Sequence, residues 1–123
     1  MSLPSVGSLT IFRTLSLVAA AQAVKNASGA LYGGMVTNNA TSVRWIKFYN
    51  TLASGVIVGT TVPIITWGLP GQTTGSVAAI LGAAGQNGLM FSVAISVACT
   101  TGLADADTGA PAANDVVANF FWI

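Results

Sequence analysis

Hydrophobic and polar residues alternate along several short segments of the chain, most clearly in residues 42–50 (SVRWIKFYN). Ile46 and Phe48 fall on one side of this alternation, whereas Trp45 and Tyr49 fall on the other side, together with the lysine between them. A period of two is typical of a β-strand with one buried face. We therefore predict a strand that places Ile46 and Phe48 in the core, with Trp45, Tyr49 and the lysine on a partly covered outer face.

Residues 89–99 (LMFSVAISVAC) alternate in the same way, but their two faces differ in size. Large apolar side chains alternate with small or mildly polar ones, which predicts a strand whose small face packs closely against another part of the protein. The large face comprises Phe91, Val93, Ile95, Val97 and Cys99, and the small face comprises Ser92, Ala94, Ser96 and Ala98. Cys99 is expected to be a buried, unreactive thiol.

Five further segments contain short apolar runs bounded by turn-forming residues. Residues 31–38, 59–71 and 115–123 are predicted to be strands. Residues 76–88 fit either a short strand with a loop or one helical turn. Residues 9–23 satisfy both the strand and the helix period, and we interpret them as a strand that follows a polar N-terminal arm. Segment 115–123 carries bulky side chains on both faces, which is most simply explained by a contact between subunits.

A succession of about seven or eight short strands with little helix predicts an all-β fold. We expect a single-domain antiparallel β-sandwich or jelly roll with an N-terminal arm. The length of 123 residues is typical of one domain, and no repeat or linker divides the chain. We assign residues 1–24 to the N-terminal arm and first strand, and residues 25–123 to the β-sandwich domain.

The composition indicates that much of the surface consists of uncharged Ser, Thr, Asn, Gln and Gly, and that other protein chains cover much of it. Only 6% of the residues are charged and 53% are hydrophobic, whereas about a quarter of the residues of an ordinary globular protein are charged. Seven charged side chains cannot keep the surface of a monomer of this size free of apolar patches. We therefore expect an obligate assembly. No apolar run reaches the ~20 residues of a spanning helix, so we expect no membrane partner.

The charges also narrow the range of functions. Four basic and three acidic residues give a net charge of +1, which is too little for nucleic-acid binding by counterion release. The chain contains no histidine and no glutamate, which removes most general acid–base, nucleophilic and zinc chemistry. We predict that the protein is not an enzyme and has no cofactor.

All acidic side chains lie in one segment, residues 102–117 (GLADADTGAPAANDVV). Asp105 and Asp107 have the spacing of the first two ligands of a calcium loop, but Gly109 stands at the third ligand position and no glutamate closes the site. A hydrolase is disfavoured, because carboxylates two residues apart are poorly placed to flank a scissile bond. We favour a solvated loop in which Asp105 and Asp107 make local turns, and keep the pair as the candidate metal ligands.

Three stretches of the sequence together resemble a known family: KNASGALYGGMVTNNATSVRWIKFYN, VGTTVPIITWGLPG and ISVACTTGLADADTGAPAANDVVANFFWI. Their order and spacing, from about Lys25 to Ile123, are similar to those of capsid decoration (cement) proteins of tailed bacteriophages. The resemblance implies a β-sandwich or jelly-roll subunit, commonly a homotrimer, that binds the major capsid protein lattice on the outer face of the head. It implies a virion protein, made in the host cytoplasm, that acts through apolar contacts.

Such a protein needs contacts with its own copies and with the shell. We expect the terminal strand between subunits and residues 2–18 on the shell. The candidate interface residues are Phe12, Leu15, Trp45, Tyr49, Phe120, Phe121, Trp122 and Ile123. An alternative function is a phage fibre or tail-tip domain that holds a host surface glycan on Trp45 and Tyr49. The competing interpretation of these two aromatic residues is packing between sheets or subunits.

Overall fold

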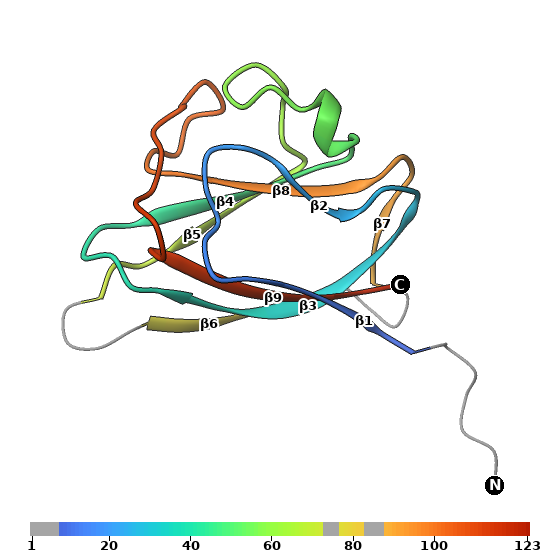
Figure 1. The fold of residues 1–123 in the computed structure, drawn as a ribbon, viewed down its shortest axis with the longest axis horizontal. Coiled ribbons are helices and arrows are strands. Elements are labelled where there is room, and N and C mark those ends of the chain that lie inside the picture. Colours follow the sequence, from blue (N-terminus) through green and yellow to red (C-terminus); the bar gives the residue numbers. More distant parts are fainter. Residues whose placement is uncertain (1–7, 73–76, 83–87) are drawn as a thin grey trace, which may run out of the picture.

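The protein is built from two antiparallel β-sheets that face each other (Figure 1). The computed structural model describes residues 8–72, 77–82 and 88–123, the segment 77–82 by its backbone alone. Sheet A contains, in spatial order, β1 (Thr10–Thr14), β9 (Val116–Trp122), β3 (Gly29–Asn38) and β6 (Val77–Gly82), and the short strand β7 (Leu89–Phe91) also pairs with β3. Sheet B contains β2 (Gln22–Lys25), β8 (Ile95–Thr100), β4 (Arg44–Tyr49) and β5 (Ile65–Leu69). This confirms the predicted all-β, sandwich-like architecture.

The strand pairings are nested along the sequence. β4 pairs with β5, β3 with β6, β2 with β8 and β1 with β9, every pair antiparallel. Two further pairings, β3 with β9 and β4 with β8, join the nested pairs within each sheet. The chain therefore runs like one long hairpin, folded over so that its strands are distributed between two sheets.

The core lies between the sheets and is filled by the apolar faces of the strands. Ile46 and Phe48 of β4 are fully buried there, as their alternation predicts. Phe48 meets Phe120 of β9 edge to face, with ring centroids 5.0 Å apart. Burial of each side chain of this size contributes about 1.5–3 kcal/mol, so these cross-sheet contacts hold the two layers together.

Residues 9–23 differ from the prediction of a single strand. They contain β1 in sheet A and the start of β2 in sheet B, joined by a link that crosses the end of the sandwich. Leu17 in this link is fully buried, and its backbone N–H donates to Val116 O at 3.0 Å. This link therefore contributes a side chain, Leu17, to the hydrophobic core. β2 also spans the expected boundary between residues 24 and 25, whereas all but the last residue of the predicted arm, which precedes residue 9, lies outside the described residues.

Residues 89–99 are also divided between the sheets, contrary to the prediction of one strand. β7 pairs with β3 in sheet A, and β8 pairs with β2 and β4 in sheet B. At the crossing, the Asn50 side chain accepts the backbone N–H of Val93 at 2.8 Å and donates to Ser92 Oγ at 2.9 Å. Val93 is consequently 51% exposed and does not belong to the core.

The remaining predictions are largely confirmed. Residues 31–38 and 115–123 form most of β3 and β9. Of residues 59–71 only Ile65–Leu69 form a strand, because the residues before them make turns that cover sheet B. In segment 76–88, Val77–Gly82 form strand β6 rather than a helical turn, and residues 83–87 lie outside the described part.

Candidate functional site

The outer face of sheet A carries an apolar surface that none of the described segments covers. Pairing between β1 and β9 places Ile11 opposite Phe121, and pairing between β3 and β9 places Met35 opposite Asn119, all on the side away from the core. Ile11 is 62% exposed and Met35 52% exposed. We call this surface the sheet A face: exposed Ile11, Arg13, Met35 and Met90, with half-buried Val117, Phe121 and Ile123. An exposed apolar area of this kind marks an interaction site.

Arg13 is the one charged side chain of the sheet A face among the described residues. It lies opposite Asn119 in the β1–β9 pairing and is exposed. It makes no ion pair and no hydrogen bond within the part of the chain that is described. A single unpaired cation thus lies on a largely apolar surface, next to the uncharged polar side chain of Asn119.

The outer face of sheet B, by contrast, is covered by two loops, residues 50–64 and 101–115 (Figure 1). Ser96 Oγ donates to Thr51 O at 2.8 Å, and Lys47 Nζ donates to Ala104 O at 2.6 Å. Beneath the loops, the small face of β8 is fully buried, as predicted. The expectation of a partly covered face for Lys47 is wrong, because its ammonium group is fully enclosed and bound by a loop carbonyl.

Tyr49 is also fully buried beneath these loops, so it cannot serve as an interface residue in this fold. Burial, and secondarily the charge of Asp105, raises the pKa of its phenol. Its hydroxyl has no hydrogen-bond partner in the described structure. Tyr49 therefore lies on the outer face of sheet B, as its alternation predicts, but the prediction of a partly covered face is wrong, because the covering loops enclose it.

Trp45 stays half-buried at the other end of β4. Its ring packs on Gly68 of β5, where a Cβ atom would come within 2.6 Å of Trp45 Cζ3. Because Tyr49 is enclosed and Trp45 rests on the neighbouring strand, the two do not form the open aromatic platform that a glycan site requires.

The two covering loops carry further exposed apolar side chains. Ile57 is 64% and Val62 68% exposed, and Leu103 projects from the other loop, also exposed. The loops lie side by side, since a Cβ at Gly59 would contact Thr108 and the backbone of Ala106. We call this the loop surface: Ile57, Val62, Ile64, Leu103 and the exposed carboxylate of Asp105.

The three aspartates serve different purposes. Asp107 Oδ1 accepts the backbone N–H of Gly109 at 2.8 Å and of Gly102 at 3.3 Å, which confirms a local turn at this residue. Asp105 is exposed and makes no comparable bond, so the turn predicted for it is absent. Asp115 belongs to a different contact. The described residues contain no group of three or more side chains arranged to ligate a metal ion.

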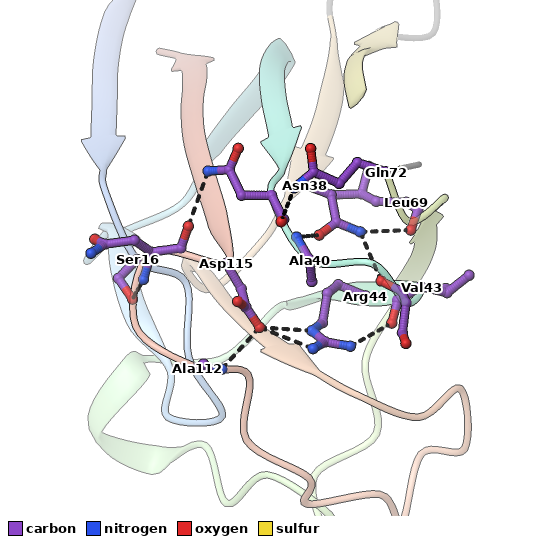
Figure 2. Close-up of polar contacts among 12 residues, drawn as sticks. Ser16, Asn38, Ala40, Val43, Arg44, Leu69, Gln72, Ala112 and Asp115 are labelled. Carbon is purple, nitrogen blue, oxygen red and sulfur yellow. Dashed lines mark hydrogen bonds and ion pairs between the residues drawn. The ribbon is translucent and has the colours of Figure 1, made fainter. Parts of the chain in front are cut away.

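Figure 2 shows the polar contacts that close one end of the sandwich. Asp115 Oδ2 pairs with Arg44 Nη2 at 3.0 Å and also accepts the Arg44 Nε–H and the backbone N–H of Ala112. Fully buried Asn38 donates to the carbonyls of Ser42, Leu69 and Pro70 and accepts the backbone N–H of Ala40. These bonds fix the β3–β4 turn against β5 and β9. The sequence analysis did not single out Asn38, although an Asn–Asn pair at a turn was a signal for it.

The remaining interface candidates differ in position. Phe120 is fully buried between Phe12 and Phe48, so its expected interface role is corrected to a core role. Phe12 and Trp122 are half-buried and pack against the core. Leu15 is exposed just beyond β1, and Phe121 and Ile123 belong to the sheet A face. Subunit contacts through these residues remain a prediction.

Cys99 is the one cysteine of the chain and is fully buried, as predicted. Burial is the largest cause that raises the pKa of its thiol, to about 12. A thiol with such a pKa stays protonated near neutral pH and is a poor nucleophile.

Comparisons with protein-family models, with curated proteins and with solved structures gave no match. Among the described residues, no helix combines the length and apolar character needed to cross a bilayer. The candidate functional site therefore consists of the exposed apolar residues of the sheet A face and of the loops that cover sheet B.

Proposed function

We propose that the protein is a structural virion protein, a capsid decoration or cement protein of a tailed bacteriophage. It would bind the major capsid protein lattice on the outer surface of the head as a homotrimer, after synthesis in the host cytoplasm. The observation that carries this proposal is the bare sheet A face, where Ile11 and Met35 are exposed in a chain with 6% charged residues. Exposed apolar surfaces of this kind are typical of sites that bind another protein.

We further propose that the sandwich is a jelly roll. The order β1-β9-β3-β6 faces the order β2-β8-β4-β5, which is the result of folding four nested antiparallel pairs over into two layers. β7 is an additional short strand at the side of β3. Jelly rolls are common among viral capsid and lectin domains, so the topology supports a virion role without specifying it.

A cement protein acts through contact area rather than through chemistry. Each 1,000 Å² of apolar surface removed from water contributes about 25 kcal/mol before the costs of association. Repetition over a lattice multiplies this effect. We include in the proposal that the protein is not an enzyme and has no cofactor. The residue composition, with no histidine and no glutamate, fits such a role.

The test is binding of the purified protein to phage heads that lack it, measured by cosedimentation. We expect saturable binding in a fixed ratio to the major capsid protein and a higher disruption temperature of the decorated heads. Leu15→Asp should weaken binding, because exposed Leu15 lies in the segment predicted to meet the shell. Thr41→Asp, at an exposed position at the end of the sandwich, is the matched control. Absence of binding at micromolar concentrations would contradict the proposal.

The alternative proposal is a fibre or tail-tip domain that binds a host glycan. It is not favoured by the geometry, because it relied on Trp45 together with Tyr49, and Tyr49 is enclosed. Specific binding of the isolated protein on a glycan array, combined with failure to bind heads, would reverse this preference.

A further inference from the structure

The charged side chains are almost all engaged within the chain. Of the seven, five contact groups of their own chain through an ion pair, hydrogen bonds or an aromatic ring: Arg44, Asp115, Lys47, Asp107 and Lys25. Lys25 Nζ lies 5.4 Å from the centroid of a Trp122 ring. The two that remain are Arg13 and Asp105, which are exposed and make no ion pair or hydrogen bond in the described part of the chain.

These two charges are opposite in sign, and each lies on one of the two exposed apolar surfaces. Arg13 is on the sheet A face, and Asp105 is on the loop surface. In Figure 1 the two surfaces lie on opposite sides of the sandwich, below sheet A and above sheet B. The chain therefore carries two apolar surfaces with complementary charges, pointing away from each other.

We propose that the sheet A face of one copy packs on the loop surface of the next copy, with Arg13 opposite Asp105. The partner is thus a second copy of this chain, joined head to tail. Apolar residues on both sides supply the contact, and the ion pair fixes its orientation. An Arg–Asp pair enclosed by Ile11 and Met35 on one side and Leu103 on the other is shielded from water, and so discriminates more strongly than an exposed pair.

The sheet A face is large enough for a weak contact. β9 has seven residues, which span about 23 Å, and the strands β1, β9 and β3 at about 4.8 Å spacing give a width of about 14 Å. This outline of about 330 Å² corresponds to a small, weak interface rather than to the ~800 Å² per partner of standard-size interfaces.

The arrangement determines the symmetry. Two different surfaces on opposite sides give a heterologous contact, which repeats from copy to copy. Because the two surfaces point in opposite directions, this contact stacks the copies in an open row, whereas a closed ring would need contact surfaces that are inclined to each other. The contact goes beyond the proposed function, because it joins copies of the chain to each other and holds or fails in solution without any shell.

The experiment uses the variants R13E and D105R in analytical ultracentrifugation. Wild-type protein should associate in the micromolar range, and high salt should weaken the association. Each single variant places like charges opposite each other, so its dissociation constant should rise about tenfold or more. An equimolar mixture of R13E and D105R should regain association, because each variant then finds the opposite charge on the other. The double variant R13E/D105R should also regain it.

Circular dichroism confirms that the variants are folded, and Thr41→Glu serves as the control that adds a negative charge outside both surfaces. The inference is overturned if wild-type protein is monomeric up to high micromolar concentrations, or if R13E and D105R associate like wild type. It is equally overturned if neither the mixture nor the double variant regains association. If wild-type protein binds heads but R13E and D105R do not change self-association, this contact alone is contradicted. If R13E and D105R change self-association as expected but wild-type protein does not bind heads, the proposed function alone is contradicted.

Discussion

The Tyr49 hydroxyl is buried without a hydrogen-bond partner in the described structure. An unsatisfied buried hydroxyl costs about 1–3 kcal/mol. Tyr49→Phe removes the hydroxyl and keeps the ring, so the variant should be as stable as wild type or up to about 2 kcal/mol more stable. Chemical denaturation measures the difference. A loss of stability larger than 1 kcal/mol would mean that the hydroxyl has a partner, such as a buried water molecule.

Because the Cys99 thiol is buried, the free energy of unfolding should fall as the pH becomes alkaline. Burial raises its pKa from 9.0 to about 12 in the folded protein. A raised pKa favours the neutral form in the folded state, so the stabilisation is complete below the unfolded pKa and is lost as the pH rises toward the folded value. Wild type should therefore lose stability between pH 9 and about 12 more steeply than Cys99→Ala does. The free energies of unfolding are measured by urea denaturation at each pH. Equal losses of unfolding free energy in the two proteins over this range would contradict the account.

At the scale of elements, loop 101–115 depends on Asp107. Asp107→Ala removes the acceptor for the backbone N–H groups of Gly102 and Gly109, which should cost about 1–3 kcal/mol. Hydrogen exchange of the Gly109 amide should accelerate. Asp105→Ala is the matched control, because Asp105 is exposed and makes no such bonds, and its stability should stay within about 0.5 kcal/mol of wild type. Equal effects of the two substitutions would contradict the different roles of these aspartates.

Strand β9 offers two neighbouring phenylalanines with different roles. Phe120 fills the core and Phe121 belongs to the sheet A face. Phe120→Ala should cost about 3–5 kcal/mol in unfolding free energy. Phe121→Ala should cost less than Phe120→Ala but should weaken self-association. Denaturation and sedimentation equilibrium measure the two effects. If Phe121→Ala left association unchanged, the sheet A face would not be the contact surface.

The sequence predicts the faces of strands better than it predicts their connections. The alternation around Ile46 and Phe48 is a local property, and it assigned both residues to the core correctly. The crossings near Leu17 and Val93 interrupt an alternation that continues unbroken in the sequence, because tertiary contacts of Leu17 and Asn50 determine them. The burial of Tyr49 depends on where a distant loop folds back. No local pattern contains this information.

At the scale of the whole molecule, the two sides of the sandwich differ in how they are covered. Loops of the same chain cover sheet B and bury even a lysine, Lys47. No described segment covers sheet A in this way, and exposed apolar residues remain on it. The low charge content agrees with the proposal that a neighbouring chain completes the packing of sheet A. The sequence predicted such an assembly from composition, but the position of the uncovered face required the strand register.

The most direct test of the central claim is cryo-electron microscopy of the intact phage particle, at a resolution that traces the chain. The account predicts density for this protein on the outer surface of the head, with its sheet A face covered by a neighbouring protein and Arg13 facing a carboxylate. Density confined to the tail or fibres, or a sheet A face open to solvent in the assembled particle, would contradict it.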